Sequence, residues 1–123
     1  LDHFKRVNDE LGHAMGDRVL QTFARVARDE VRGGDVLARW GGEEFLLMMP
    51  DTGASVAWHC VERIHRAVHS TNFDQAPDDF VVTFSAGLAI CQTADDVEAA
   101  IDRADQAMYR AKAAGRNRTE LAG

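Results

Sequence analysis

Two adjacent glycines between two short apolar runs constrain the architecture of this 123-residue chain more than any other feature. Gly41 and Gly42 separate residues 36–40 from residues 45–49, and both runs have the length and composition of β-strands. Paired glycines readily adopt the positive φ angles that a tight hairpin turn requires. Strands joined by a hairpin are antiparallel, so the sheet cannot be of the all-parallel kind.

Apolar residues recur at helical spacing in three other segments. The first opens at Gly16-Asp17 and ends at Gly33-Gly34, while the last follows a cap at Thr93 or Asp95 and stops at Gly115. The apolar positions of the three predicted helices run over residues 19–31, 57–68 and 97–111.

Residues 80–90 read as one long strand, in which Gly87 indicates a bulge or the close approach of another backbone. Residues 73–79, which carry Pro77, read as a loop. The predicted fold is therefore a single α/β (α+β) sandwich of the ferredoxin-like type, with a mostly antiparallel central sheet covered by helices.

Composition narrows the class of protein. The chain is 46% hydrophobic and 28% charged with a net charge of −6, which is ordinary for a soluble globular domain and argues against general nucleic-acid binding. The apolar runs are too short to span a membrane. Cys60 and Cys91 lie in apolar stretches, so we expect two buried thiols in a reducing, cytoplasmic compartment. The first residue is Leu1, which predicts a piece of a longer chain.

Two adjacent carboxylates, Glu43 and Glu44, follow the glycine turn. Like charges this close repel, and a site that keeps both ionised usually supplies a cation. Carboxylates on a turn suit Mg²⁺, which is commonly shared with substrate phosphates. Taken alone, the pair is better explained as two solvated side chains beside a hairpin.

Two dense polar clusters occupy residues 2–9 and 12–17. A carboxylate accepts hydrogen bonds from the ring N–H and amino group of guanine, and an amide complements the rest of that edge. An Asn and an Asp brought together could therefore read a purine, although caps and turns of the first helices explain the same residues.

Four motifs together resemble a known family, the GGDEF domains or diguanylate cyclases. They are Asp-x-Phe-Lys-x-x-Asn-Asp at residues 2–9, Gly-His-x-x-Gly-Asp at 12–17, Arg-x-Gly-Gly-Glu-Glu-Phe at 39–45 and Tyr-x-Ala-Lys-x-x-Gly-Arg-Asn at 109–117. Their order and spacing cover nearly the whole chain. The resemblance implies a palm-like fold and a Mg²⁺- or Mn²⁺-dependent enzyme that joins two GTP into cyclic di-GMP and pyrophosphate.

The resemblance also implies a role for individual residues. Glu43 would hold the metal and help to deprotonate the attacking 3′-hydroxyl, with Glu44 and the backbone carbonyl of Leu1 as further ligands. Asn8 and Asp17 would read guanine. The triphosphate would be held by backbone N–H groups of Phe4 and Lys5 and by the side chains of Lys112 and Arg116. Each domain would hold one GTP, so the catalytic unit would be a homodimer.

A second site is implied by Arg32-Gly33-Gly34-Asp35, which is separated from Gly41 by five residues. It resembles the Arg-x-x-Asp site at which cyclic di-GMP inhibits the family. Arg63 on the next predicted helix matches the secondary arginine of that site. A helix cap followed by a turn is the alternative explanation of the same residues.

One departure from the family pattern concerns the metal. The family motif begins Asp-x-Asp, and its first Asp would precede Leu1. Residues 1–123 are thus expected to form a domain that lacks its first helix and most of its first strand, and a missing central strand predicts poor solubility or strand exchange.

Two alternatives to a cyclase stay open. One is a non-catalytic module that senses GTP or cyclic di-GMP and controls an attached domain. The other is a palm-type transferase that acts on a different nucleotide. None of the three functions requires nucleic acid or direct membrane contact, although the parent protein could be membrane-anchored. Glu62, His65 and His69 share a predicted helix face and could bind a metal, but solvated histidines are far commoner.

Overall fold

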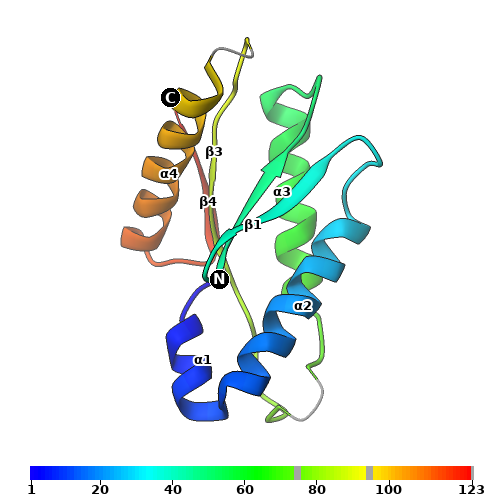
Figure 1. Cartoon of the computed structure of the whole chain (residues 1–123), viewed down its shortest axis with the longest axis vertical. Coiled ribbons are helices and arrows are strands. Elements are labelled where there is room, and N and C mark those ends of the chain that lie inside the picture. The colour runs from blue at the N-terminus through cyan, green and yellow to red at the C-terminus, as the bar shows by residue number, and fades with distance from the viewer. Residues whose placement is uncertain (74–75, 94–95, 123) are drawn as a thin grey trace.

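The short strands lie between two long helices, and the first helix and the start of the second extend away from them below the N-terminus in this view (Figure 1). The computed structural model describes residues 1–73, 76–93 and 96–122. The elements in chain order are α1 (Phe4–Leu11), α2 (His13–Asp29), β1 (Val36–Gly41), β2 (Glu44–Met48), α3 (Ala54–His69), β3 (Ser85–Leu88), α4 (Val97–Ala113) and β4 (Arg118–Leu121).

The main core lies between α2, α3 and the extended segment that leads into β3. Phe23 of α2 is its centre, with its ring 4.9 Å from that of Phe45 and 5.3 Å from that of Phe84. Phe45 belongs to β2 and Phe84 directly precedes β3. The Phe23 side chain therefore packs α2 against both strand pairs. Apolar burial of this kind is the main stabilising contribution to such a domain.

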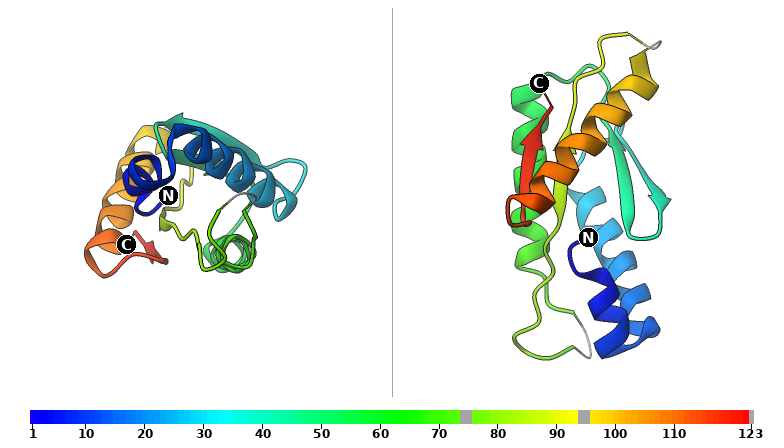
Figure 2. Two further views of the ribbon diagram at one scale, coloured as in Figure 1. Left: turned by 90° about the horizontal axis from the view of Figure 1, so that it is seen from below. Right: turned by 90° about the vertical axis from the view of Figure 1, so that its left-hand side faces the viewer.

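The strands form two separate pairs among the described residues. β1 and β2 are antiparallel, with Val36 opposite Met48 and a shift in register around Trp40. β3 and β4 are parallel, with Ser85 opposite Arg118, and α4 is the crossover between them. Figure 2 shows α4 lying along this second pair.

Gly87 of β3 explains how closely α4 approaches the strand. A Cβ at this position would overlap the backbone carbonyl of Ala104 and the backbone nitrogen of Met108. The prediction that another backbone comes close to Gly87 is therefore confirmed.

The predicted hairpin and the three predicted helices are also confirmed, with α2 starting at His13 rather than at Gly16-Asp17. The N-cap of α4 is Asp96 rather than the predicted Thr93, whose hydroxyl instead donates a hydrogen bond of 2.9 Å to the Asp96 carboxylate. The alternative cap, Asp95, and part of the 73–79 loop lie outside the described residues.

Two expectations were wrong. The strand predicted over residues 80–90 is limited to β3, because residues 80–84 make no strand ladder within the described chain. Cys91 is exposed rather than buried, whereas Cys60 is buried as expected. None of the helices in the described part of the chain has the length and hydrophobicity needed to cross a bilayer.

Candidate active site

The turn between β1 and β2 presents both glutamates beside the N-terminal segment (Figure 1). Gly42 takes a φ of 52°, and its carbonyl accepts a hydrogen bond of 2.8 Å from Nε of Arg39. The backbone carbonyl of Glu43 accepts a hydrogen bond of 3.0 Å from the nitrogen of Leu1. The turn is thus fixed on both sides, and Glu43 and Glu44 are half-buried rather than free in solvent.

A cavity of about 460 Å³ lies between this hairpin, β3 and α4. Most of its wall is apolar, and the wall also includes Leu1, Glu43, Glu44 and Lys112, from the N-terminus, the hairpin and the last helix. Two carboxylates and an ammonium group at one cavity are suited to bind a metal ion together with phosphate oxygens.

The donor set fits a cation that is shared with substrate. Within the described residues, no group of three or more His, Cys, Asp or Glu side chains could enclose a metal ion. Mg²⁺ does not need such an enclosure, because it usually keeps several waters and binds one or two carboxylates plus phosphates. Glu43 and Glu44, with a backbone carbonyl at Leu1, would supply protein oxygens of the right kind.

The two predicted guanine-reading residues lie on α1 and α2, two helices that pack against each other. The amide of Asn8 lies directly over Gly16, at a place where any Cβ would overlap it. Asp17 is the next residue of α2 and is exposed. The lack of a side chain at Gly16 therefore makes room for the Asn8 amide, one residue before Asp17. That the two side chains read guanine together stays a prediction.

The predicted triphosphate-binding residues come from two ends of the chain. Phe4 and Lys5 lie in the first turn of α1, where backbone N–H groups lack helical partners and favour anions. Lys112 lies on α4, and Arg116 is exposed in the turn between α4 and β4.

Asp2 is a buried carboxylate in this region to which sequence reasoning assigned no role. It is only 7% exposed, and it accepts hydrogen bonds from the hydroxyls of Thr83 and Ser85 and from the backbone N–H of Asn117. Burial opposes ionisation, but these hydrogen bonds outweigh it and hold the pKa of Asp2 below its ordinary value. Its place in the Asp-x-Phe-Lys motif was the only available signal.

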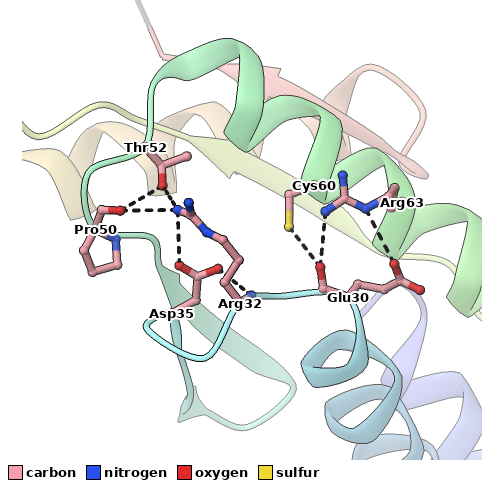
Figure 3. A network of polar contacts seen from close by, with 7 residues as sticks. All are labelled: Glu30, Arg32, Asp35, Pro50, Thr52, Cys60 and Arg63. Atoms are coloured by element: carbon pink, nitrogen blue, oxygen red, sulfur yellow. Dashed lines mark hydrogen bonds and ion pairs between the residues drawn. The ribbon is translucent and has the colours of Figure 1, made fainter.

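The predicted inhibitory residues lie at the opposite end of α2, and each arginine already has partners within the chain (Figure 3). Arg32 donates to the hydroxyl of Thr52 and to the carbonyl of Pro50, and its backbone N–H donates to Asp35 over 3.0 Å. Arg63 donates to the backbone carbonyl of Glu30 over 3.2 Å and lies 3.6 Å from its carboxylate.

His65 is half-buried and packs against a core aromatic ring rather than being a solvated residue. Its ring stacks on Phe84 at 3.8 Å and makes a 2.9 Å hydrogen bond with the hydroxyl of Thr119. Burial lowers the pKa of His65 below 6.5, although Glu62 and Asp2 favour its charged form. His69 is exposed, so the structure does not bring Glu62, His65 and His69 together as a metal site.

The lowered pKa of His65 makes stability depend on pH. Because protons bind the unfolded chain more readily than the folded one, the free energy of unfolding falls as the pH drops below 6.5. We expect His65→Gln to reduce this acid-induced loss, as measured by urea unfolding between pH 8 and pH 5. His69→Gln, at an exposed position on the same helix, is the control and should leave the slope unchanged. An equal slope in wild type and His65→Gln would contradict the assignment.

Comparisons with known proteins identify the family. The family model described as "Diguanylate cyclase, GGDEF domain" matches residues 1–118. The chain is 42% identical over 122 residues to the diguanylate cyclase DgcP of Pseudomonas aeruginosa, covering 99% of this chain and 18% of DgcP. It therefore spans less than a fifth of the length of that relative.

Two solved structures share the fold. The GGDEF domain of DgcB from Caulobacter crescentus, in complex with c-di-GMP, has a TM-score of 0.90 and 35% identity, with 98% of this chain and 72% of that chain covered. The active GGEEF domain of a diguanylate cyclase from Vibrio cholerae has a TM-score of 0.84 and 31% identity, with 99% of this chain and 78% of that chain covered. The predicted mixed α/β fold is thus confirmed, and the chain belongs to the GGDEF domain family of diguanylate cyclases.

Proposed function

We propose that this chain forms the catalytic domain of a diguanylate cyclase, which converts two GTP into cyclic di-GMP and two pyrophosphates. The observation that carries the proposal is the cavity at which Leu1, Glu43, Glu44 and Lys112 meet. The active Vibrio cholerae domain carries the same GGEEF signature as residues 41–45, which supports an active site here.

The proposed chemistry divides the work among these residues. Asn8 and Asp17 bind the guanine edge, while Lys112, Arg116 and the first turn of α1 hold the β- and γ-phosphates. Glu43 accepts the proton of the 3′-hydroxyl as that oxygen bonds to the α-phosphorus of the other GTP and pyrophosphate leaves. A magnesium ion held by Glu43, Glu44 and the Leu1 carbonyl would neutralise phosphate charge.

Closing the ring requires two such transfers in opposite directions. One domain binds one GTP through the residues named above, so we propose that two copies face each other during turnover. The direct test is incubation of the parent-length domain, with the strand that precedes Leu1 restored, with GTP and Mg²⁺, followed by chromatographic detection of cyclic di-GMP. A folded protein that binds GTP and forms no product would favour the sensing module instead.

We also propose that Arg32, Asp35 and Arg63 bind the product as an inhibitor. Arg side chains offer paired donors to guanine and phosphate. In the free domain these donors point to Thr52, Pro50 and Glu30, so the ligand must replace those partners (Figure 3). The side chain of Arg32 is 63% exposed and that of Arg63 is 48% exposed. Replacing their present partners therefore costs little free energy.

Removing the charge of Glu30 should therefore strengthen inhibition. We expect Glu30→Gln to lower the dissociation constant for cyclic di-GMP by about two- to fivefold, because an exposed ion pair contributes about 0–1 kcal/mol. Calorimetric titration of cyclic di-GMP measures the change. Glu10→Gln, which removes the comparable exposed pair between Arg6 and Glu10 on α1, is the matched control. Equal affinities in Glu30→Gln and wild type would show that Glu30 does not compete with the ligand.

A further inference from the structure

Asp2 connects three segments that are far apart in the sequence. Its Oδ1 accepts a 2.6 Å hydrogen bond from the hydroxyl of Ser85, and its Oδ2 accepts one of 2.8 Å from the hydroxyl of Thr83. The same Oδ2 accepts a 3.0 Å hydrogen bond from the backbone N–H of Asn117. The backbone N–H of Asp2 donates to the carbonyl of Thr83, which fixes the N-terminal segment alongside residues 83–85.

The turn that contains Asn117 needs such support. Arg116 and Asn117 have φ angles of 66° and 49°, in a region that residues other than glycine rarely adopt. On the helix side, the backbone N–H of Arg116 donates to the carbonyl of Ala111 over 2.9 Å. On the other side, the next N–H along the chain donates to Asp2. The direction in which the exposed Arg116 leaves the backbone is thus fixed between α4 and Asp2.

The same contact sets the turn against the start of α1. Asp2 lies two residues before Phe4, the first residue of α1. The backbone N–H groups in the first turn of a helix have no hydrogen-bond partners within the helix. Both protein elements proposed to hold the triphosphate are therefore linked through one carboxylate.

We propose that Asp2 is a positioning residue for the triphosphate. Its hydrogen bond from the N–H of Asn117 keeps Arg116 in a fixed position relative to the first turn of α1. Asp2 itself does not touch GTP. This inference rests on the proposed function, since it presumes that Arg116 and α1 hold the β- and γ-phosphates. It predicts a loss that depends on those phosphates and spares the guanine contacts made by Asn8 and Asp17.

The test compares GTP with GMP, which lacks the β- and γ-phosphates. We expect Asp2→Ala to raise the dissociation constant for GTP by about tenfold, as loss of a fixed charged contact commonly does, and to change that for GMP by less than about twofold. Asp2→Asn should restore most of the GTP affinity, because its amide oxygen can still accept from Asn117 while its amide nitrogen donates to Ser85. Titration calorimetry with each nucleotide gives both constants.

Thr83→Val is the matched control, because it removes another hydrogen bond to the same carboxylate oxygen and leaves the contact with Asn117 in place. Its GTP affinity should stay within about twofold of wild type. If Asp2→Ala does not fold, Asp2→Ser takes its place, since the shorter hydroxyl cannot reach Asn117. Equal losses for GTP and GMP, or an equal effect of Thr83→Val, would overturn the proposal and leave Asp2 with a role in stability alone.

Hydrogen exchange separates this inference from the proposed function. In the protein without nucleotide, the amide of Asn117 should exchange about tenfold faster in Asp2→Ala than in Thr83→Val. Failure of the wild type to bind GTP would refute the proposed function, and fast exchange in Asp2→Ala would still show that Asp2 anchors the turn. Unchanged exchange at Asn117 would refute the anchoring itself, even if the wild type is an active cyclase.

Discussion

Replacing Glu43 by Gln is expected to lower the rate of cyclic di-GMP formation by about 10²–10⁴-fold, the range typical for loss of a general base. Gln has nearly the same size as Glu, so the hairpin turn and its hydrogen bond to Leu1, which uses the backbone of residue 43, should persist. Its neutral amide neither accepts the 3′-hydroxyl proton nor binds a magnesium ion well. Chromatographic product analysis at saturating GTP and Mg²⁺ measures the loss.

The control for this variant is Glu62→Gln, which removes a carboxylate from α3 that is not part of the cavity wall. Its rate should equal that of the wild type. The guanine contacts of Asn8 and Asp17 are untouched in Glu43→Gln, so its GTP affinity without added metal should also be unchanged. A Glu43→Gln rate within about tenfold of wild type would mean that another group removes the proton.

Replacing Gly87 by Ala is expected to lower the free energy of unfolding by about 3 kcal/mol, at the upper end of what overpacking usually costs. The added methyl group would overlap the backbone of Ala104 and Met108, and backbone atoms cannot turn aside as a flexible side chain can. α4 would have to move away from β3 and would take Lys112 with it. Urea unfolding followed by circular dichroism measures the change in stability.

Gly34→Ala is the matched control, because a Cβ at Gly34 would meet no atom within 4 Å. Its free energy of unfolding should change by less than about 0.5 kcal/mol, and a small gain is possible because alanine restricts the unfolded chain. A loss in Gly87→Ala as small as that in Gly34→Ala would show that α4 shifts at no cost.

Local signals in the sequence were sufficient for the hairpin and for the three long helices. The glycine pair at Gly41-Gly42, the apolar stripe of α3 and the stop at Gly115 each act over a few residues. They specify structure without knowledge of distant partners.

Features that depend on distant partners could not be predicted in this way. α1 has only eight residues, and a helix this short depends on packing against α2 rather than on its own propensity. β4 is four residues long, and its parallel pairing with β3 becomes visible only when α4 is in place. The role of Asp2 depends on Thr83, Ser85 and Asn117, which no spacing rule connects to it.

The hydrogen bond between Asp2 and Asn117 closes a loop of 115 residues, which has a consequence for folding. Closing a long loop costs chain entropy before its contacts can compensate, so contacts of this separation form late. The proposed triphosphate site would then be among the last parts of the domain to assemble and among the first to open. A nucleotide bound there would contact both α1 and the turn before β4, so we expect GTP to slow the unfolding of the entire domain rather than to rigidify one loop.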